Sequence, residues 1–154
     1  MLELIFKALS AIAIAGISSW ITVQLSRNKF RSERWWERKV LAYERVIDAF
    51  HSSKIFYSEH IRAEELQLEM DDERRTELKN QARKARDDIL RASDIGSFIL
   101  SGSALKILAK YEAESENMPR KDSWYEYLDS SWSVTNSYMK EFIAAAHADL
   151  GNRA

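Results

Sequence analysis

The chain has 154 residues, with 23 lysines and arginines against 24 aspartates and glutamates, and it contains no cysteine. The charge balance argues against the whole chain being an electrostatic partner of nucleic acid. The lack of cysteine excludes disulfides, thiolate zinc sites and cysteine nucleophiles. Because there are only four glycines and one proline, helix breakers are rare and the sequence predicts an all-α protein.

The segment 4–25 reads LIFKALSAIAIAGISSWITVQL and is long and apolar. Its 22 residues would reach about 33 Å as a helix, enough to cross a hydrocarbon core of about 30 Å. Lys7, its one charged residue, lies a turn from the N-terminal end, where a lysine can extend to the headgroups. We therefore predict that residues 1–26 form a transmembrane anchor with a single helix.

Two other interpretations of this segment stay open. A cleaved signal peptide would use small residues such as Ala11 and Ala13, although the apolar run continues past them into a basic block. A buried core helix is the second alternative, because serine, threonine and glutamine make the segment only moderately apolar.

One face of the predicted span carries small residues at spacings of three and four. They are Ala8, Ala11, Ala15, Ser18 and Thr22. Such a face lets two helix backbones approach closely in lipid. It predicts a homo-oligomer, or packing against another membrane protein.

A basic and aromatic juxtamembrane segment, residues 27–39, follows the span. Its residues expected at lipid headgroups are Arg27, Lys29, Arg31, Arg34, Trp35, Arg38 and Lys39. Lysine and arginine beside a span stay in the cytoplasm and are attracted to anionic lipid. We expect the N-terminus outside, the C-terminal domain in the cytoplasm, and one helix continuing through this segment.

Residues 40–151 have the periodicity of a three- or four-helix antiparallel bundle, with residues 152–154 as a tail. Apolar seams alternate steps of four and three, as in a coiled coil. The predicted inward-facing residues include Trp36, Tyr43, Ile47, Ile89, Trp132 and Phe142.

The predicted helix boundaries rest on capping residues. The first helix should end near Met70, and Asp71 can cap the second. Ser101-Gly102-Ser103 interrupts the pattern before a short helix, which Pro119 ends. Ser123 and Glu126 form a capping box for the last helix, and Gly151 can end it.

The second helix carries a basic stripe on the face opposite its seam. The stripe consists of Arg75, Lys79, Arg83 and Arg86. It is typical of a solvated face, and it is also a candidate site for an anion or a partner. Nucleic acid is the less favoured partner, because the acidic residues Glu77, Asp87 and Asp88 balance the stripe.

Motifs that carry catalytic chemistry are absent from the sequence. Asp48 and His51 have the spacing of a di-iron pair, but no second pair exists. There is no G-x-S-x-G elbow and no glycine-rich phosphate loop. We therefore expect no enzyme activity, no metal site and no cofactor.

The combination of the span with WWERKVLAYERVIDAF and SDIGSFILS resembles a group of small bacterial single-span membrane proteins with a cytoplasmic helical domain. The resemblance covers the first third of the chain and residues 93–101. It implies a bacterial inner-membrane location, and it implies no activity and no site residues.

Three functions are consistent with these features. The first is a membrane-tethered interaction, scaffold or sensor module that recruits a cytoplasmic or membrane partner. The second is an oligomerising membrane effector that permeabilises the bilayer, as defence and toxin proteins do. The third is a membrane receptor for a nucleotide or oligonucleotide, which would bind at the basic stripe.

Overall fold

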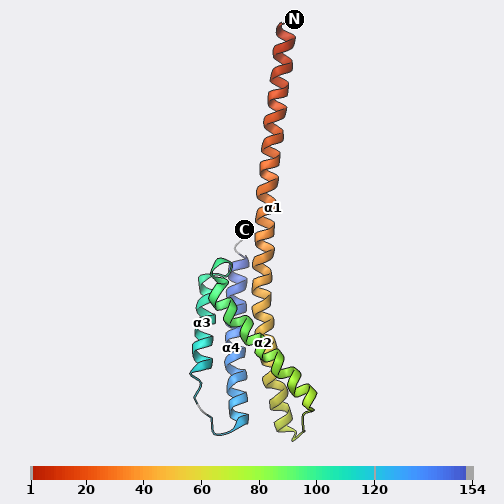
Figure 1. The fold of residues 1–154 in the computed structure, drawn as a ribbon. Helices are drawn as coiled ribbons and strands as arrows, with labels where there is room; N and C mark the ends of the chain where they lie inside the picture. Colours follow the sequence, from red (N-terminus) through yellow and green to blue (C-terminus); the bar gives the residue numbers. More distant parts are fainter. Residues whose placement is uncertain (1, 120, 152–154) are drawn as a thin grey trace. The chain divides into compact units, whose positions relative to one another are not determined.

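The computed structural model describes the backbone of residues 2–119 and 121–151, and the side chains of residues 33–119 and 121–151. Four α-helices make up nearly all of it: α1 (Leu2–Glu65), α2 (Asp72–Ile95), α3 (Gly102–Glu116) and α4 (Trp124–Gly151). A short 3-10 helix, η1 (Gly96–Phe98), follows α2 directly. The described part of the chain contains no strand, so the predicted all-α class is confirmed (Figure 1).

The chain divides into two compact units, Met1–Arg38 and Lys39–Ala154. Helix α1 begins in the first unit and ends in the second. Among the residues whose side chains are described, no helix combines the length and apolarity needed to cross a membrane. The predicted span 4–25 and its small-residue face lie outside those residues.

The second unit is an antiparallel helical bundle. Between α1 and α4, Lys39 contacts Asp149 and Glu65 contacts Tyr125. The two helices are therefore antiparallel. The same is true of α1 and α2, which pair Glu59 with Arg74. Helices α3 and α4 pack together over much of the length of α3 (Figure 1).

The core lies where the four helices of the second unit meet, with α2 contributing Ala85 and Ile89. Phe142 of α4 is fully buried, and its ring centroid lies 5.5 Å from that of Tyr43 and 5.9 Å from that of Phe50. Phe50 also meets the edge of Tyr111, at 4.9 Å between centroids. These rings hold the first helix against the third and fourth through burial and favourable tilted or edge-to-face contacts.

The predicted inward-facing residues are only partly correct. Tyr43, Ile89 and Phe142 are buried, and Ile47 is half-buried against the core. Trp132 is also half-buried, with the Lys54 ammonium 5.2 Å from its ring centroid. Trp36 is half-buried within the first unit.

Side-chain caps account for three helix starts: Asp71 and Ser123 as predicted, and Ser101 at the predicted interruption of the pattern. Asp71 accepts from the Arg74 amide at 3.4 Å, Ser101 from the Ala104 amide at 3.2 Å, and Ser123 from the Glu126 amide at 3.1 Å. Each side-chain oxygen satisfies an amide that has no partner within the helix. Helix α3 ends at Glu116, just before Asn117-Met118-Pro119 as predicted.

Helix α1 ends at Glu65 rather than near Met70. The Leu68 amide donates to the Ala63 carbonyl at 2.9 Å, and the Gln67 amide donates to the Glu64 carbonyl at 3.2 Å. Gln67 has a φ of 50°. This pattern is a Schellman motif with glutamine in the left-handed position that glycine usually occupies. Without that glycine, the end of the helix has no clear signal in the sequence.

Candidate functional site

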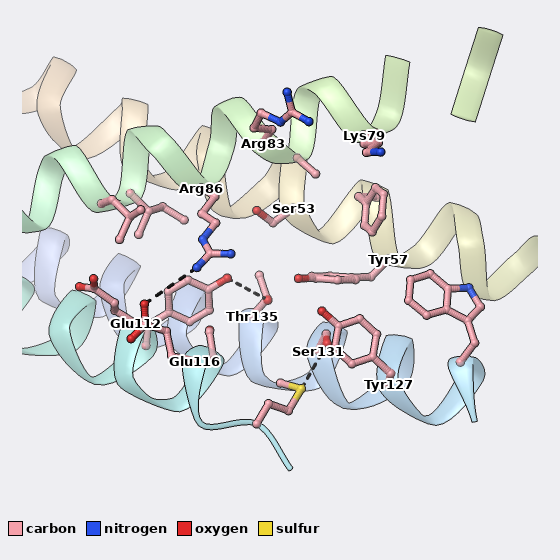
Figure 2. Close-up of a pocket in the computed structure, with 18 residues that line it drawn as sticks. Ser53, Tyr57, Lys79, Arg83, Arg86, Glu112, Glu116, Tyr127, Ser131 and Thr135 are labelled. Carbon is pink, nitrogen blue, oxygen red and sulfur yellow. Dashed lines mark hydrogen bonds and ion pairs between the residues drawn. The ribbon is translucent and has the colours of Figure 1, made fainter. Parts of the chain in front are cut away.

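A cavity of about 470 Å³ opens between all four helices of the second unit (Figure 2). Its size falls in the range of about 300–1,000 Å³ typical of small-molecule sites. The polar residues that line it are Ser53, Tyr57, Lys79, Arg83, Arg86, Tyr111, Glu112, Ser115, Glu116, Tyr127, Ser131 and Thr135. The other walls are apolar and aromatic.

The cavity exists because small residues occupy positions where a bundle normally packs large ones. Ser53 of α1, Ala82 of α2, and Ser131 and Thr135 of α4 all line it. Ser53, Ser131 and Thr135 are buried, at 6%, 3% and 1% exposure. Buried hydroxyl groups at these inward positions give the walls hydrogen-bonding capacity that aliphatic side chains would not give.

The buried hydroxyl groups either bond within their own helix or make contacts that are longer than a typical hydrogen bond. Ser53 donates to the Ala49 carbonyl at 3.0 Å, Thr135 lies 3.3 Å from the Tyr111 hydroxyl, and Ser131 contacts the Met118 sulfur at 3.4 Å. The sulfur is a weak acceptor, and the Thr135 contact is longer than a typical hydroxyl pair. The hydroxyls of Ser131 and Thr135 are therefore held only by weak contacts.

Tyr57 supplies a phenol to the interior of the cavity. Burial raises the pKa of Tyr57, and the nearby phenols of Tyr111 and Tyr127 add to this increase, while Ser131 and Arg86 oppose it. The phenol therefore stays protonated at neutral pH. A protonated hydroxyl can donate a hydrogen bond to an anionic or carbonyl oxygen.

Three cationic side chains of α2 border the cavity: Lys79, Arg83 and Arg86. Arg86 extends across toward α3, whereas Arg83 extends away from the interior (Figure 2). Arg86 Nη2 lies 3.9 Å from Glu116 Oε1, and both side chains are more than half exposed. An exposed ion pair of this length contributes little, so the Arg86 guanidinium can take another anionic partner.

The end of the cavity near the start of α4 is aromatic. Trp124 and Tyr127 stack at 5.3 Å between centroids with an interplanar angle of 17°. Both rings are exposed, at 49% and 38%. Tyr57 and Phe56 come from the facing turn of α1 and also line the cavity. The site therefore has planar rings at one end and a guanidinium toward the other.

The structure brings together most of the predicted basic stripe. Lys79, Arg83 and Arg86 border the same cavity, but Arg75 does not. Arg75 pairs with Asp72 at 2.8 Å and donates to the Met70 carbonyl at 3.0 Å, where it helps to close the turn before α2. Its position at the edge of a separate hollow excludes it from the main site.

The predicted lipid-contacting residues fall into two groups. Arg27, Lys29 and Arg31 lie outside the residues whose side chains are described. Arg34, Trp35 and Arg38 are exposed, and Lys39 instead forms a 2.8 Å ion pair with Asp149. His51 of the weighed Asp48–His51 pair is exposed, and no three metal-ligating side chains gather within the described part of the chain.

Sequence reasoning missed the residues that complete the cavity. The sequence patterns do not single out Ser53, Tyr57, Tyr111, Ser131 or Thr135 as site residues. The available signal was the run of serine and threonine at inward positions of two helices. Periodicity alone does not reveal that these small polar residues face one another and leave a space between them.

A second polar cluster lies at the opposite end of the bundle. The Tyr43 hydroxyl donates to Asp149 at 2.6 Å and accepts from the Ser101 amide at 3.0 Å. Lys39 completes it through Asp149. Burial alone would raise the pKa of Asp149, but the hydrogen bonds from Lys39 and Tyr43 outweigh it and lower that pKa. The cluster ties the first turns of the second unit to α3 and α4.

Comparison with protein-family models, with curated proteins and with solved structures found no match to this chain. The cavity and its residues are therefore the basis for the functional argument.

Proposed function

We propose that the chain is a membrane-tethered helical sensor. In this proposal residues 4–25 anchor it in a bacterial inner membrane, and the bundle binds a cytoplasmic ligand. The observation that carries the proposal is the cavity of about 470 Å³ between all four helices, with buried hydroxyls and cationic side chains in its walls. A bundle that served only as a spacer would gain stability by filling this volume with apolar side chains.

The residue types of the cavity favour binding over catalysis. Its walls contain no histidine, cysteine or aspartate within the described residues. Tyr57 has a raised pKa, which makes it a poor base at neutral pH. Hydroxyl donors, aromatic rings and arginine are the groups that orient a ligand. This composition supports a receptor that recognises a molecule and leaves it unchanged.

The experiment compares ligand capture by the full chain and by a filled cavity. Full-length protein in detergent is dialysed to equilibrium against a small-molecule extract of a bacterial cell, and the enriched compounds are identified by mass spectrometry. Ala82→Leu places a larger apolar side chain in the wall of the cavity. Ala113→Leu is the matched control, because Ala113 is exposed on α3 and does not line the cavity.

We expect wild-type protein and Ala113→Leu to enrich the same compound, and Ala82→Leu to lose it while retaining its helical content. If no compound is enriched, or if all three proteins enrich it equally, the sensor proposal is wrong.

A second candidate function is recruitment of a protein partner. It is favoured by five exposed apolar or aromatic side chains where α1 ends and α4 begins: Leu66, Leu68, Trp124, Tyr125 and Tyr127. Tyr125 donates to Glu65 at 3.0 Å, so these two helix ends lie side by side. Clustered exposed apolar residues often mark interaction sites. Reduced co-purification of a defined partner after Leu68→Asp and Tyr125→Asp would support this function.

A further inference from the structure

The arrangement of charge and aromatic rings in the cavity indicates a ligand class. We infer that the cavity binds a nucleoside phosphate, with its phosphate at Arg86 and its base among Tyr57, Tyr127 and Trp124. This inference rests on the proposed sensor function and deepens it.

Arg86 is suited to a phosphate. It extends into the space between α2 and α3 (Figure 2), and its contact with Glu116 is long, at 3.9 Å. Guanidinium groups bind phosphate oxygens through two parallel hydrogen bonds. Such a pair is shorter and stronger than the present contact, so a phosphate can displace the Glu116 carboxylate.

The surroundings of Arg86 add further attraction for an anion. Lys79 and Arg83 border the cavity on the same helix, and among the described residues no carboxylate lies within ion-pair distance of either cation. Glu112 and Glu116 oppose them from α3. Arg86 and its neighbours Lys79 and Arg83 supply cationic groups at this edge of the cavity, which favours an anionic ligand group at Arg86.

The aromatic end is suited to a planar base. The Trp124 and Tyr127 rings stack on each other, and both remain exposed at the edge of the cavity. Tyr57 lies across from them on α1 and points into the interior (Figure 2). Aromatic side chains bind bases by stacking with little preference among them.

The spacing of the two ends matches a ligand of nucleotide length. Tyr127 and Thr135 lie eight residues apart on α4, which is about 12 Å along a helix. Thr135 contacts Tyr111, and both residues line the cavity together with Arg86. A base beside Tyr127 therefore places its phosphate near Arg86, and the ribose passes the hydroxyls of Ser131 and Tyr57 on the way.

Two other classes of ligand would each match only one end of the cavity. A free inorganic anion would use Arg86 but leave the rings without a partner. An uncharged aromatic compound would use the rings but leave the cationic edge unmatched. The combination of both ends in one cavity distinguishes a nucleoside phosphate from either.

The test measures binding to the full chain in detergent by isothermal titration calorimetry. The probes are the four nucleoside 5′-monophosphates, the corresponding nucleosides, and inorganic phosphate. We expect at least one monophosphate to bind about tenfold more tightly than its nucleoside or than phosphate, because each end contributes separately. Raising the salt concentration should weaken this binding.

Two variants test which part of the ligand binds at each end of the cavity. Arg86→Gln should weaken the monophosphate about tenfold or more and leave nucleoside binding unchanged. Tyr127→Leu should weaken both monophosphate and nucleoside. Arg91→Gln is the matched control, because Arg91 is exposed on the same helix and does not line the cavity. Circular dichroism of each variant verifies that the bundle is folded.

The outcomes separate this inference from the proposed function. If the dialysis experiment enriches a compound that is not a nucleotide, and Ala82→Leu abolishes that enrichment, the sensor function stands and the nucleotide inference is wrong. Equal binding of monophosphate to wild-type protein and Arg86→Gln would also overturn the inference. If neither calorimetry nor dialysis detects binding, both proposals fail.

Discussion

At the residue scale, Asp149 shows how an unfavourable position is stabilised by its neighbours. It lies in the last turn of α4, where a negative charge is repelled by the helix dipole. Lys39 and Tyr43 each donate a hydrogen bond to its carboxylate, at 2.8 Å and 2.6 Å. Charged hydrogen bonds of this length exceed the repulsion, so the pKa of Asp149 is lowered.

This arrangement predicts a pH dependence of stability. Because the folded pKa of Asp149 lies below its ordinary value of 3.8, its contribution is present above that value and is lost as the pH falls through the folded pKa. Asp149→Asn should destabilise the bundle by about 1 kcal/mol at pH 7. The difference from wild type, measured by urea unfolding, should shrink below about pH 4.

Asp129→Asn is the control for this prediction, since Asp129 is exposed on the same helix. This variant should change the free energy of unfolding by no more than about 0.5 kcal/mol. A difference between Asp149→Asn and wild type that stays constant from pH 7 to pH 3 would contradict the prediction.

Gln67 occupies a backbone conformation that suits glycine. Its backbone φ of 50° lies in the left-handed region, where a residue with a Cβ is less stable than glycine by about 1 kcal/mol. Gln67→Gly should therefore raise the free energy of unfolding by about 0.5–1 kcal/mol. Chemical unfolding measures this change. Gln81→Gly, in the interior of α2, should destabilise it by about 1 kcal/mol. Destabilisation by Gln67→Gly would show that its side chain has a role of its own.

At the scale of the elements, α4 packs against α3 and contacts α1. Its buried face contains Leu128, Thr135, Phe142 and Ala146, and its contacts reach α1 and α3. Helix α2 is different, since charged and polar residues cover most of it and its buried residues are Leu78, Ala85 and Ile89. The inward face of α2 carries small residues such as Ala82, and this leaves room for the cavity.

Phe142→Ala tests the packing of α4 against α1. The ring is fully buried between Tyr43 and Phe50, so its removal should cost about 3–5 kcal/mol. Phe98→Ala makes the same chemical change at a side chain that is 80% exposed and should cost little. The measurement is urea unfolding followed by tryptophan fluorescence. Similar losses for the two variants would mean that α4 does not pack as described.

At the scale of the whole molecule, the proposed sensor needs its bundle on the cytoplasmic side. A reporter that is active only in the cytoplasm, fused after Ala154, should be active, because six basic residues follow the predicted span closely. The same reporter at the N-terminus should be inactive. The reverse pattern would invert the orientation, and activity of both fusions would contradict a membrane-spanning segment.

The sequence by itself determined the helical class, the capping residues and much of the core. These features depend on local order along the chain: apolar residues every three or four positions, an Asp or Ser before a helix, and a proline after one. Asp71 and Ser123 are identified as caps in this way, because a cap bonds to an amide only three residues away.

Only the tertiary structure decided where the cavity lies and which residues share it. Ser53, Arg86, Tyr111 and Ser131 come from four different helices, and no local pattern indicates that they meet. The sequence identified Lys79, Arg83 and Arg86 as one basic stripe with Arg75, since all four share a helical face. The fold separates Arg75 from them, because the turn at Met70 gives Arg75 a backbone partner of its own.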